Sequence, residues 1–194
     1  DGLPAEGSLL PETYAYSRGD TKQDKINRMQ SAMADALESL WASRAEGLPY
    51  KNKEEALVLA SIIEKETAVP SERTKVAGVF VNRLKQGMRL QTDPTVIYAL
   101  TDGKIEEDGQ GPLGRRLLRK DLGYDSPYNT YLYAGLPPGP IANPGYESIK
   151  AALNPADHNY LYFVADGTGG HAFAKTLAEH NRNVQNWRRI RDAQ

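Results

Sequence analysis

Glu66 is the residue of this 194-residue sequence best placed for acid/base chemistry. Leu59, Ile62, Ile63 and Glu66 stand at positions i, i+3, i+4 and i+7 of a predicted helix, so they share one face. Glu64 lies about 160° around that helix from Glu66 and belongs to a different face. A carboxyl group at the edge of a buried stripe is desolvated, which raises its pKa. Such a group can stay protonated and donate its proton to a leaving oxygen.

The same periodicity also fits a purely structural glutamate. Glu66 could lie solvated at the helix end, or pair with Lys65 or Arg73. At the level of helix spacing, both interpretations stay open.

Most glycosidases use two carboxyl groups, so a catalytic Glu66 would ordinarily have a carboxylate partner. Asp93 is the best candidate, although its position before Pro94 also predicts a helix N-cap with proline at the first helical position. Glu12 is a second candidate, in a loop. The sequence therefore offers one well-placed carboxylate and no clear mate for it.

Other catalytic chemistries have weak support. The three histidines, His158, His171 and His180, are not spaced as metal ligands, and there is no cysteine. The sequence contains no nucleophile elbow, phosphate-binding loop or dinucleotide fingerprint. We expect no metal and no cofactor.

Two segments could form the walls of a binding groove. Residues 124–133 contain four tyrosines, together with Asn129 and Thr130, and residues 136–144 are rich in proline. Tyrosine rings and amide groups suit sugars, whose apolar faces are ringed by hydroxyl groups. Ordinary packing explains the same tyrosines equally well.

The elements around these residues predict an α+β fold: a helix-rich single domain over residues 1–194 with a small antiparallel hairpin at about 160–174. A short strand is expected at 88–91, and a mobile loop or insertion at 101–124. The periodicities and caps predict helices over residues 21–44, 52–67, 71–87, 93–100, 148–153 and 177–191.

The net charge of −1 gives no basic footprint, so no nucleic-acid partner is expected.

No apolar run approaches the roughly 20 residues of a membrane span, and no signal peptide is visible. The chain begins at Asp1 without an initiator methionine, which suggests a fragment of a longer protein.

Several segments in order resemble the catalytic domain of the MltG (YceG-like) endolytic murein transglycosylases, from about Glu6 onward. No single segment suffices, but together they are specific. They are Leu59–Ala68, Val81–Leu84, Met88–Tyr98, Ser126–Thr130, Gly135–Gly145, and Tyr160–Gly167 followed by Gly170 and His171.

The resemblance implies a lytic transglycosylase that cuts between N-acetylmuramic acid and N-acetylglucosamine, with Glu66 as the catalytic residue. Glu66 would act as acid toward the glycosidic oxygen and then as base toward the muramic acid 6-hydroxyl, which closes a 1,6-anhydro ring. No second protein carboxylate is then required. The alternatives are a hydrolytic muramidase and a non-catalytic peptidoglycan-binding module. We infer these groove residues: Gln91, Thr92, Asp93, Tyr128, Asn129, Thr130 and Asn143.

The family normally carries an N-terminal membrane helix and a small LysM-like region, and neither is visible in this sequence. The resemblance thus implies a full-length protein anchored by a single pass in the cytoplasmic (inner) membrane, with the catalytic domain facing the periplasm and the present fragment soluble. Its expected partners are peptidoglycan glycan strands and peptidoglycan synthases.

Overall fold

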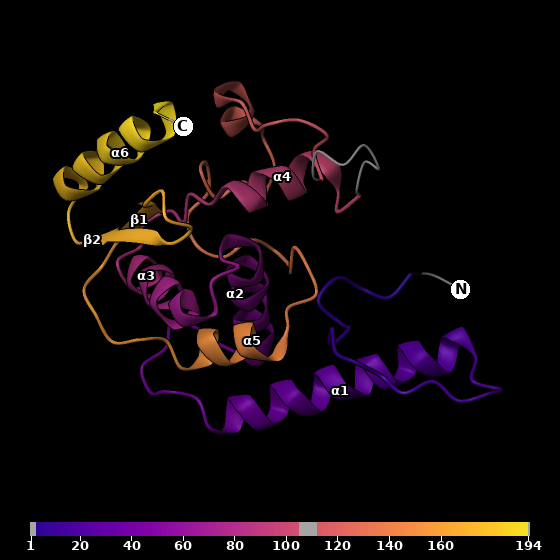
Figure 1. Ribbon diagram of the computed structural model, residues 1–194. Helices are drawn as coiled ribbons and strands as arrows, with labels where there is room; N and C mark the ends of the chain where they lie inside the picture. Colours follow the sequence, from indigo (N-terminus) through magenta and orange to yellow (C-terminus); the bar gives the residue numbers. More distant parts are fainter. Residues whose placement is uncertain (1–2, 105–111, 194) are drawn as a thin grey trace.

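The computed structural model describes residues 3–104 and 112–193, and it confirms an α+β fold rich in helix. Helices α2, α3 and α5 lie together at the centre, α1 runs along one side of them, and α6 and α4 lie toward the other side (Figure 1). The elements of the described residues are α1 (Lys22–Ala42), α2 (Lys53–Glu66), η1 (Pro70–Glu72), α3 (Arg73–Lys85), α4 (Asp93–Thr101), η2 (Arg119–Gly123), α5 (Tyr146–Leu153), β1 (Tyr162–Ala165), β2 (His171–Ala174) and α6 (Leu177–Asp192), where η denotes a 3-10 helix.

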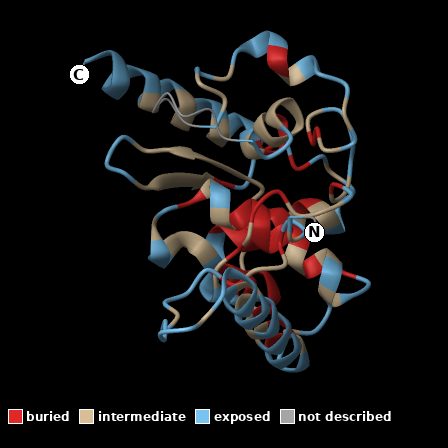
Figure 2. Ribbon diagram, turned by 90° about the vertical axis from the view of Figure 1, so that its right-hand side faces the viewer, coloured by how far each residue is buried: buried red, intermediate tan, exposed pale blue. Residues whose placement is uncertain are grey.

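Helix α2 forms the centre of the hydrophobic core. Its buried residues are distributed around most of its circumference, as expected for a helix that neighbours surround. Leu59, Ile62 and Ile63 are fully buried, and α2 contacts α1, α3, α4 and α5. Figure 2 shows the buried residues concentrated at this position, whereas much of α1 and α6 is exposed. The apolar stripe predicted to end at Glu66 is therefore a core stripe.

Both ends of α2 follow from local sequence. The side chain of Asn52, the N-cap residue, accepts a hydrogen bond from the Glu55 backbone N–H at 2.9 Å. The Glu55 carboxylate accepts the return bond from the N–H of Lys51 instead of that of Asn52, at 2.8 Å. The helix ends at Glu66 because Thr67 turns to an extended conformation. Glu66 is thus the last residue of a helix that is fixed by the core.

The predicted hairpin is confirmed. β1 and β2 pair antiparallel, with Phe163 opposite Phe173, and α6 packs against both strands. Gly78 lets the segment before the hairpin cross α3 closely, because a Cβ at this position would lie 2.6 Å from the carbonyl oxygen of Ala156. The segment before the hairpin is therefore held directly against α3.

Helix α1 confirms the prediction for residues 21–44. Thr21 caps it, and the Thr21 and Asp24 side chains bond to each other's backbone N–H groups. Met33, Leu37 and Leu40 are its buried residues. No helix within the described ranges combines the length and the apolar character that a membrane crossing demands.

Two local predictions were wrong. Residues 88–91 form no strand; instead the guanidinium of Arg83 binds the carbonyl groups of Arg89 and Leu90, and Gln91 adopts a left-handed φ of 54°. The N-cap of α4 is Thr92 and not Asp93, so Asp93 already belongs to the helix. Both deviations accompany contacts with other elements: Arg83 holds the carbonyl groups at 89 and 90, and Thr92 bonds to Glu66 and Thr130.

The predicted mobile loop at 101–124 contains the short helix η2. Asp121 is buried there and accepts hydrogen bonds from Arg115, at 2.6 Å, and from the Leu118 backbone N–H, at 2.7 Å. These bonds hold the pKa of Asp121 at about 2. The rest of this prediction falls partly on residues 105–111, which lie outside the described residues.

Candidate active site

Glu66 lies at the point where α2 ends beside the start of α4. Its side chain is half-buried, and its Oε1 accepts a hydrogen bond from the hydroxyl group of Thr92. Glu64 points elsewhere: its Oε2 accepts hydrogen bonds from the Gly145 N–H at 3.0 Å and from the Ser148 hydroxyl at 2.6 Å. The predicted separation of the two glutamates onto different faces is therefore confirmed.

A buried cluster of threonines fixes Thr92. The backbone N–H of Thr92 donates to the hydroxyl oxygen of Thr130 at 3.1 Å, and the hydroxyl of Thr95 donates to the Thr92 carbonyl at 2.7 Å. The hydroxyl oxygens of Thr95 and Thr130 are 2.8 Å apart. All three side chains are almost fully buried. Thr130 thus lies behind Thr92, where it supports the site.

A cavity of about 300 Å³ opens in front of Glu66. Its walls come from the end of α2, from α3, from the loop before α4, from β1 and from α6. Its lining combines polar and ionisable side chains with aromatic and apolar ones. The lining residues are Glu66, Val79, Phe80, Arg83, Leu90, Gln91, Asp93, Tyr131, Leu161, Tyr162, Phe163, Val164 and His180.

Burial changes the acidity of Glu66. Desolvation raises its pKa to about 7; the Thr92 hydrogen bond lowers it, the negative charge of Asp93 raises it, and His171 lowers it. A glutamate with an ordinary pKa of about 4.3 would be almost fully ionised at neutral pH. Glu66 is instead distributed between its acid and its carboxylate form, as a group that must both donate and accept a proton requires.

Asp93 and Tyr131 form a hydrogen-bonded pair in the cavity wall. The phenol of Tyr131 donates to Oδ1 of Asp93 at 2.6 Å. Burial and the Asp93 carboxylate both raise the pKa of Tyr131, so its hydroxyl remains a donor. Tyr131 was not among the groove residues inferred from the sequence. The run of tyrosines at 124–133 was the available signal, but it could not indicate which ring faces the cavity.

The remaining inferred groove residues are not all in this cavity. Asn129 is fully buried, and its amide donates to the carbonyls of Leu122 and Tyr124 at 3.0 and 2.8 Å, so it shapes the loop that presents Tyr131. Tyr128 lies against the ring of Tyr98. The site thus gathers Glu66, Gln91, Thr92 and Asp93, with Thr130 behind them.

Asn143 and Glu12 lie elsewhere. Asn143 accepts a hydrogen bond from the Leu9 N–H at 3.0 Å and lines a second cavity of about 580 Å³ beside Lys65. Glu12 lines a third, near Arg73. Within the described residues Glu66 forms no ion pair with Lys65 or Arg73. The structural interpretation of Glu66 as a surface ion-pair partner is therefore not supported.

The histidines are dispersed. His171 pairs with Glu72 at 2.6 Å, His158 contacts the carbonyl of Lys75 at 2.9 Å, and His180 stacks on Tyr162. Across residues 3–104 and 112–193, no three His, Asp or Glu side chains converge as a metal site would require.

The neighbours of Glu66 should shift its pKa in opposite directions. Asp93→Asn removes a negative charge and should lower the pKa of Glu66, whereas Thr92→Val removes a hydrogen bond to the carboxylate and should raise it. Carbon-13 NMR titration of the side-chain carboxyl groups would measure both shifts against the wild type. Shifts of the same sign in the two variants would contradict the arrangement described above.

Comparison with known proteins gives a consistent set of relatives. Residues 3–186 match the YceG-like family. The chain is 44% identical over 182 residues to an endolytic murein transglycosylase of Bacillus subtilis (strain 168), covering 92% of this chain and 47% of the relative. It is 36% identical over 186 residues to the Streptococcus pneumoniae (strain D39) protein of the same name, covering 92% of this chain and 31% of that protein. The chain thus spans less than half the length of either relative.

A solved structure agrees with the fold. A crystal structure of a yceG-like protein from Listeria monocytogenes superposes with a TM-score of 0.73 at 41% identity, over 91% of this chain and 54% of that one.

Proposed function

The chain belongs to the YceG-like family, and from this premise we propose that it is a lytic transglycosylase that cleaves peptidoglycan glycan strands. The observation that carries the proposal is Glu66, whose carboxyl group lies in the wall of a cavity of about 300 Å³ and has a pKa raised to about 7. The names of the relatives supply the substrate class, and Glu66 supplies a chemical means of cleaving it.

In the first step, protonated Glu66 donates its proton to the oxygen between N-acetylmuramic acid and N-acetylglucosamine. The bond from the muramic acid C1 to that oxygen breaks, and N-acetylglucosamine leaves with a free 4-hydroxyl. Positive charge develops at C1, where the sugar's own acetamido oxygen can stabilise it. Glu66 is now a carboxylate, held by the hydrogen bond from Thr92.

In the second step, the Glu66 carboxylate takes the proton of the muramic acid 6-hydroxyl. The oxygen of that group attacks C1, the 1,6-anhydro ring closes, and Glu66 is protonated again. No water is consumed. A pKa near the working pH suits a group that changes from acid to base within one turnover.

Asp93 and Tyr131 are proposed to position and tune Glu66. The Asp93 charge raises the pKa of Glu66, and its Oδ1 is already occupied by the Tyr131 hydroxyl. Gln91 lies at the cavity wall, where its amide can bind sugar hydroxyl or acetamido groups. Thr130 and Asn129 support the site from inside the protein. Thr130 accepts a hydrogen bond from Thr92, and Asn129 accepts one from the backbone of Tyr131.

A hydrolytic muramidase is the second candidate, and one observation favours it: Asp93 lies close enough to Glu66 to raise its pKa, so two carboxyl groups share the cavity. The product ends separate the two reactions. Uncrosslinked glycan strands digested in ¹⁸O-labelled water and analysed by mass spectrometry should give 1,6-anhydro ends without label. Labelled reducing ends would show that water attacks C1, and would replace the proposed reaction with hydrolysis.

The setting of the whole protein is also part of the proposal. By analogy with the family, we propose a membrane-anchored protein that acts on nascent strands at the outer face of the cytoplasmic membrane, beside peptidoglycan synthases. The described residues contain no spanning helix, so any anchor would lie outside them.

A further inference from the structure

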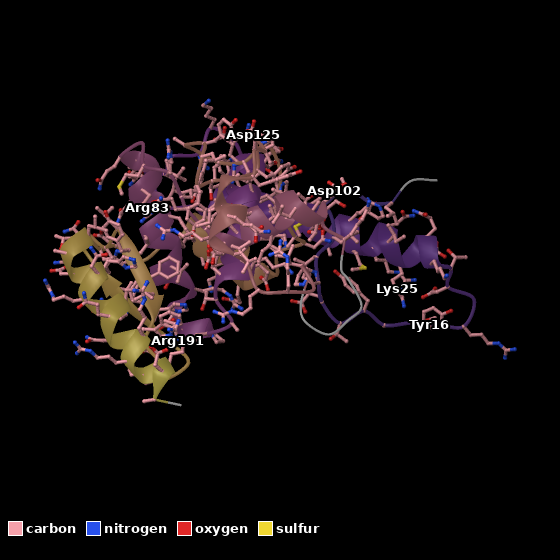
Figure 3. The ribbon with its side chains drawn as sticks, turned by 90° about the horizontal axis from the view of Figure 1, so that it is seen from above. Tyr16, Lys25, Arg83, Asp102, Asp125 and Arg191 are labelled. Carbon is pink, nitrogen blue, oxygen red and sulfur yellow. The ribbon has the colours of Figure 1, made fainter. Side chains whose placement is uncertain are left out.

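Arg83 is a buried cation in the wall of the Glu66 cavity. Its side chain is only 7% exposed. Its Nε donates to the carbonyl of Leu161 at 2.7 Å, and Nη1 donates to the carbonyls of Arg89 and Leu90 at 2.9 and 3.0 Å. Nη1 also lies 3.3 Å from the amide oxygen of Gln91. All these acceptors are neutral. Figure 3 labels Arg83 on the side of the molecule where α6 lies.

No described carboxylate comes within 4.0 Å of this guanidinium. The ring of Tyr162 lies beneath it, with the centroid 5.0 Å from the guanidinium carbon. Arginine stays protonated in proteins, and a buried charge is normally paired because an uncompensated one is costly. The positive charge is therefore hydrogen-bonded but not neutralised by the protein around it.

One donor of Arg83 remains available to the cavity. Nη2 makes no hydrogen bond to the described residues. It is not fully buried either, so it can still be reached by a ligand or solvent. Arg83 lines the same cavity as Glu66. Nη2 is therefore accessible, with free N–H groups, on a side chain that lines this cavity.

Among the described residues that line the cavity, Arg83 is the one that carries a positive charge at neutral pH. Burial and the charge of Arg83 lower the pKa of His180, so that imidazole is neutral at neutral pH. Asp93 accepts a hydrogen bond from Tyr131 and makes no ion pair with Arg83. A negatively charged ligand group would find one fixed positive partner here, already desolvated and held by its own hydrogen bonds.

We propose that Arg83 is a subsite for a carboxylate of the substrate, and that this subsite makes the enzyme select muramic-acid-containing strands over strands of N-acetylglucosamine alone. The inference rests on the proposed function. Muramic acid differs from N-acetylglucosamine by a lactyl group that ends in a carboxyl group. That carboxylate is free on peptide-free strands, and on peptide-bearing strands the stem peptide supplies carboxylates instead.

Binding should be compared in the Glu66→Gln protein, so that no ligand is consumed. Isothermal titration would use an oligosaccharide of alternating N-acetylglucosamine and N-acetylmuramic acid with free lactyl carboxylates. The comparison ligands are its methylamide, the same oligosaccharide carrying an L-alanyl-D-glutamate stem, and a chitin oligomer of equal length. We expect a carboxylate-bearing ligand to bind about tenfold more tightly than the methylamide, with the difference shrinking as salt is added. Preference for the free lactyl form identifies the lactyl carboxylate, and preference for the dipeptide form identifies the stem.

Gln91→Glu provides a variant that leaves Arg83 in place. It puts a carboxylate where an amide oxygen lies 3.3 Å from Nη1, so it should neutralise Arg83 internally and abolish the tenfold preference. Gln91→Met is the matched control, because it removes the same acceptor without adding charge and should keep the preference. Affinity for the methylamide reports separately on folding and on general sugar binding.

Two results would overturn the inference. One is equal affinity for the methylamide and both carboxylate-bearing ligands in the Glu66→Gln protein. The other is an equal loss of affinity for charged and neutral ligands in Gln91→Glu, as expected if Arg83 only ties α3 to the loop at 89–91. Neither result abolishes binding of the muramic-acid ligands by the Glu66→Gln protein. Failure to bind any of the muramic-acid ligands would instead contradict the proposed function itself.

Discussion

Glu66→Gln should reduce cleavage of glycan strands by about 10²–10⁴-fold, the usual contribution of a general acid/base. Glutamine keeps the shape of the side chain and can still bond to Thr92, but it can neither protonate the glycosidic oxygen nor take up the proton of the 6-hydroxyl. Both proposed steps therefore fail together. Initial rates of product release from uncrosslinked strands, compared with the wild type, would measure the loss.

Glu64→Gln is the matched control for this variant. It makes the same chemical change two residues earlier on the same helix, on a side chain that binds Gly145 and Ser148 and lies outside the wall of the Glu66 cavity. It should retain strand cleavage. If Glu66→Gln cleaved strands at the wild-type rate, the assignment of Glu66 would be wrong. Equal losses in the two variants would indicate damage to α2 instead of lost chemistry.

Above neutral pH, the Glu66→Gln variant should be more stable toward unfolding than the wild type. The pKa of Glu66 is about 7 in the folded chain, against about 4.3 for an unperturbed glutamate. Between these pH values the folded state binds more protons than the unfolded state, so stability falls as pH rises. Ionised Glu66 should cost about 2–3 kcal/mol of unfolding free energy above pH 7. Glutamine is neutral in both states and avoids this cost.

Urea unfolding of both proteins at about pH 5 and pH 8 would test this prediction. The stability of Glu66→Gln relative to the wild type should rise by about 2–3 kcal/mol between the two conditions, because all other ionisable groups are common to both chains. A constant difference across this range would mean that Glu66 titrates near its ordinary pKa, and would remove the basis for its role as an acid.

Sequence periodicity predicted the central elements well because their signals are local. Asn52, the apolar steps at 59, 62 and 63, and the turn between the two strands each act within a few residues. Glu66 could be distinguished from Glu64 for the same reason, since 3.6 residues per turn fix which positions share a face. Burial of that face made the raised pKa of Glu66 predictable in direction.

The loop before α4 was predicted less well because its conformation depends on distant partners. Residues 88–91 have a strand-like sequence, but the buried guanidinium of Arg83 holds two of their carbonyl groups. Thr92 bonds to Glu66 and Thr130, far from it in sequence, and the helix starts one residue earlier than the Asp-Pro pair suggested. No local pattern reports such contacts.

Residue spacing within single elements predicted the α-helices, the hairpin and the preference for Glu66 over Glu64 as the candidate acid. The environment of Glu66 depends on tertiary packing. Packing brings Tyr131 of the 124–133 run to the cavity, with Asn129 buried behind the loop that carries this tyrosine. It also places Tyr128 and Asn143 outside the lining of that cavity. It also placed Arg83 in the wall of the cavity without a carboxylate partner in the described residues. Desolvation and charge act through space, so they become defined only when distant segments pack together.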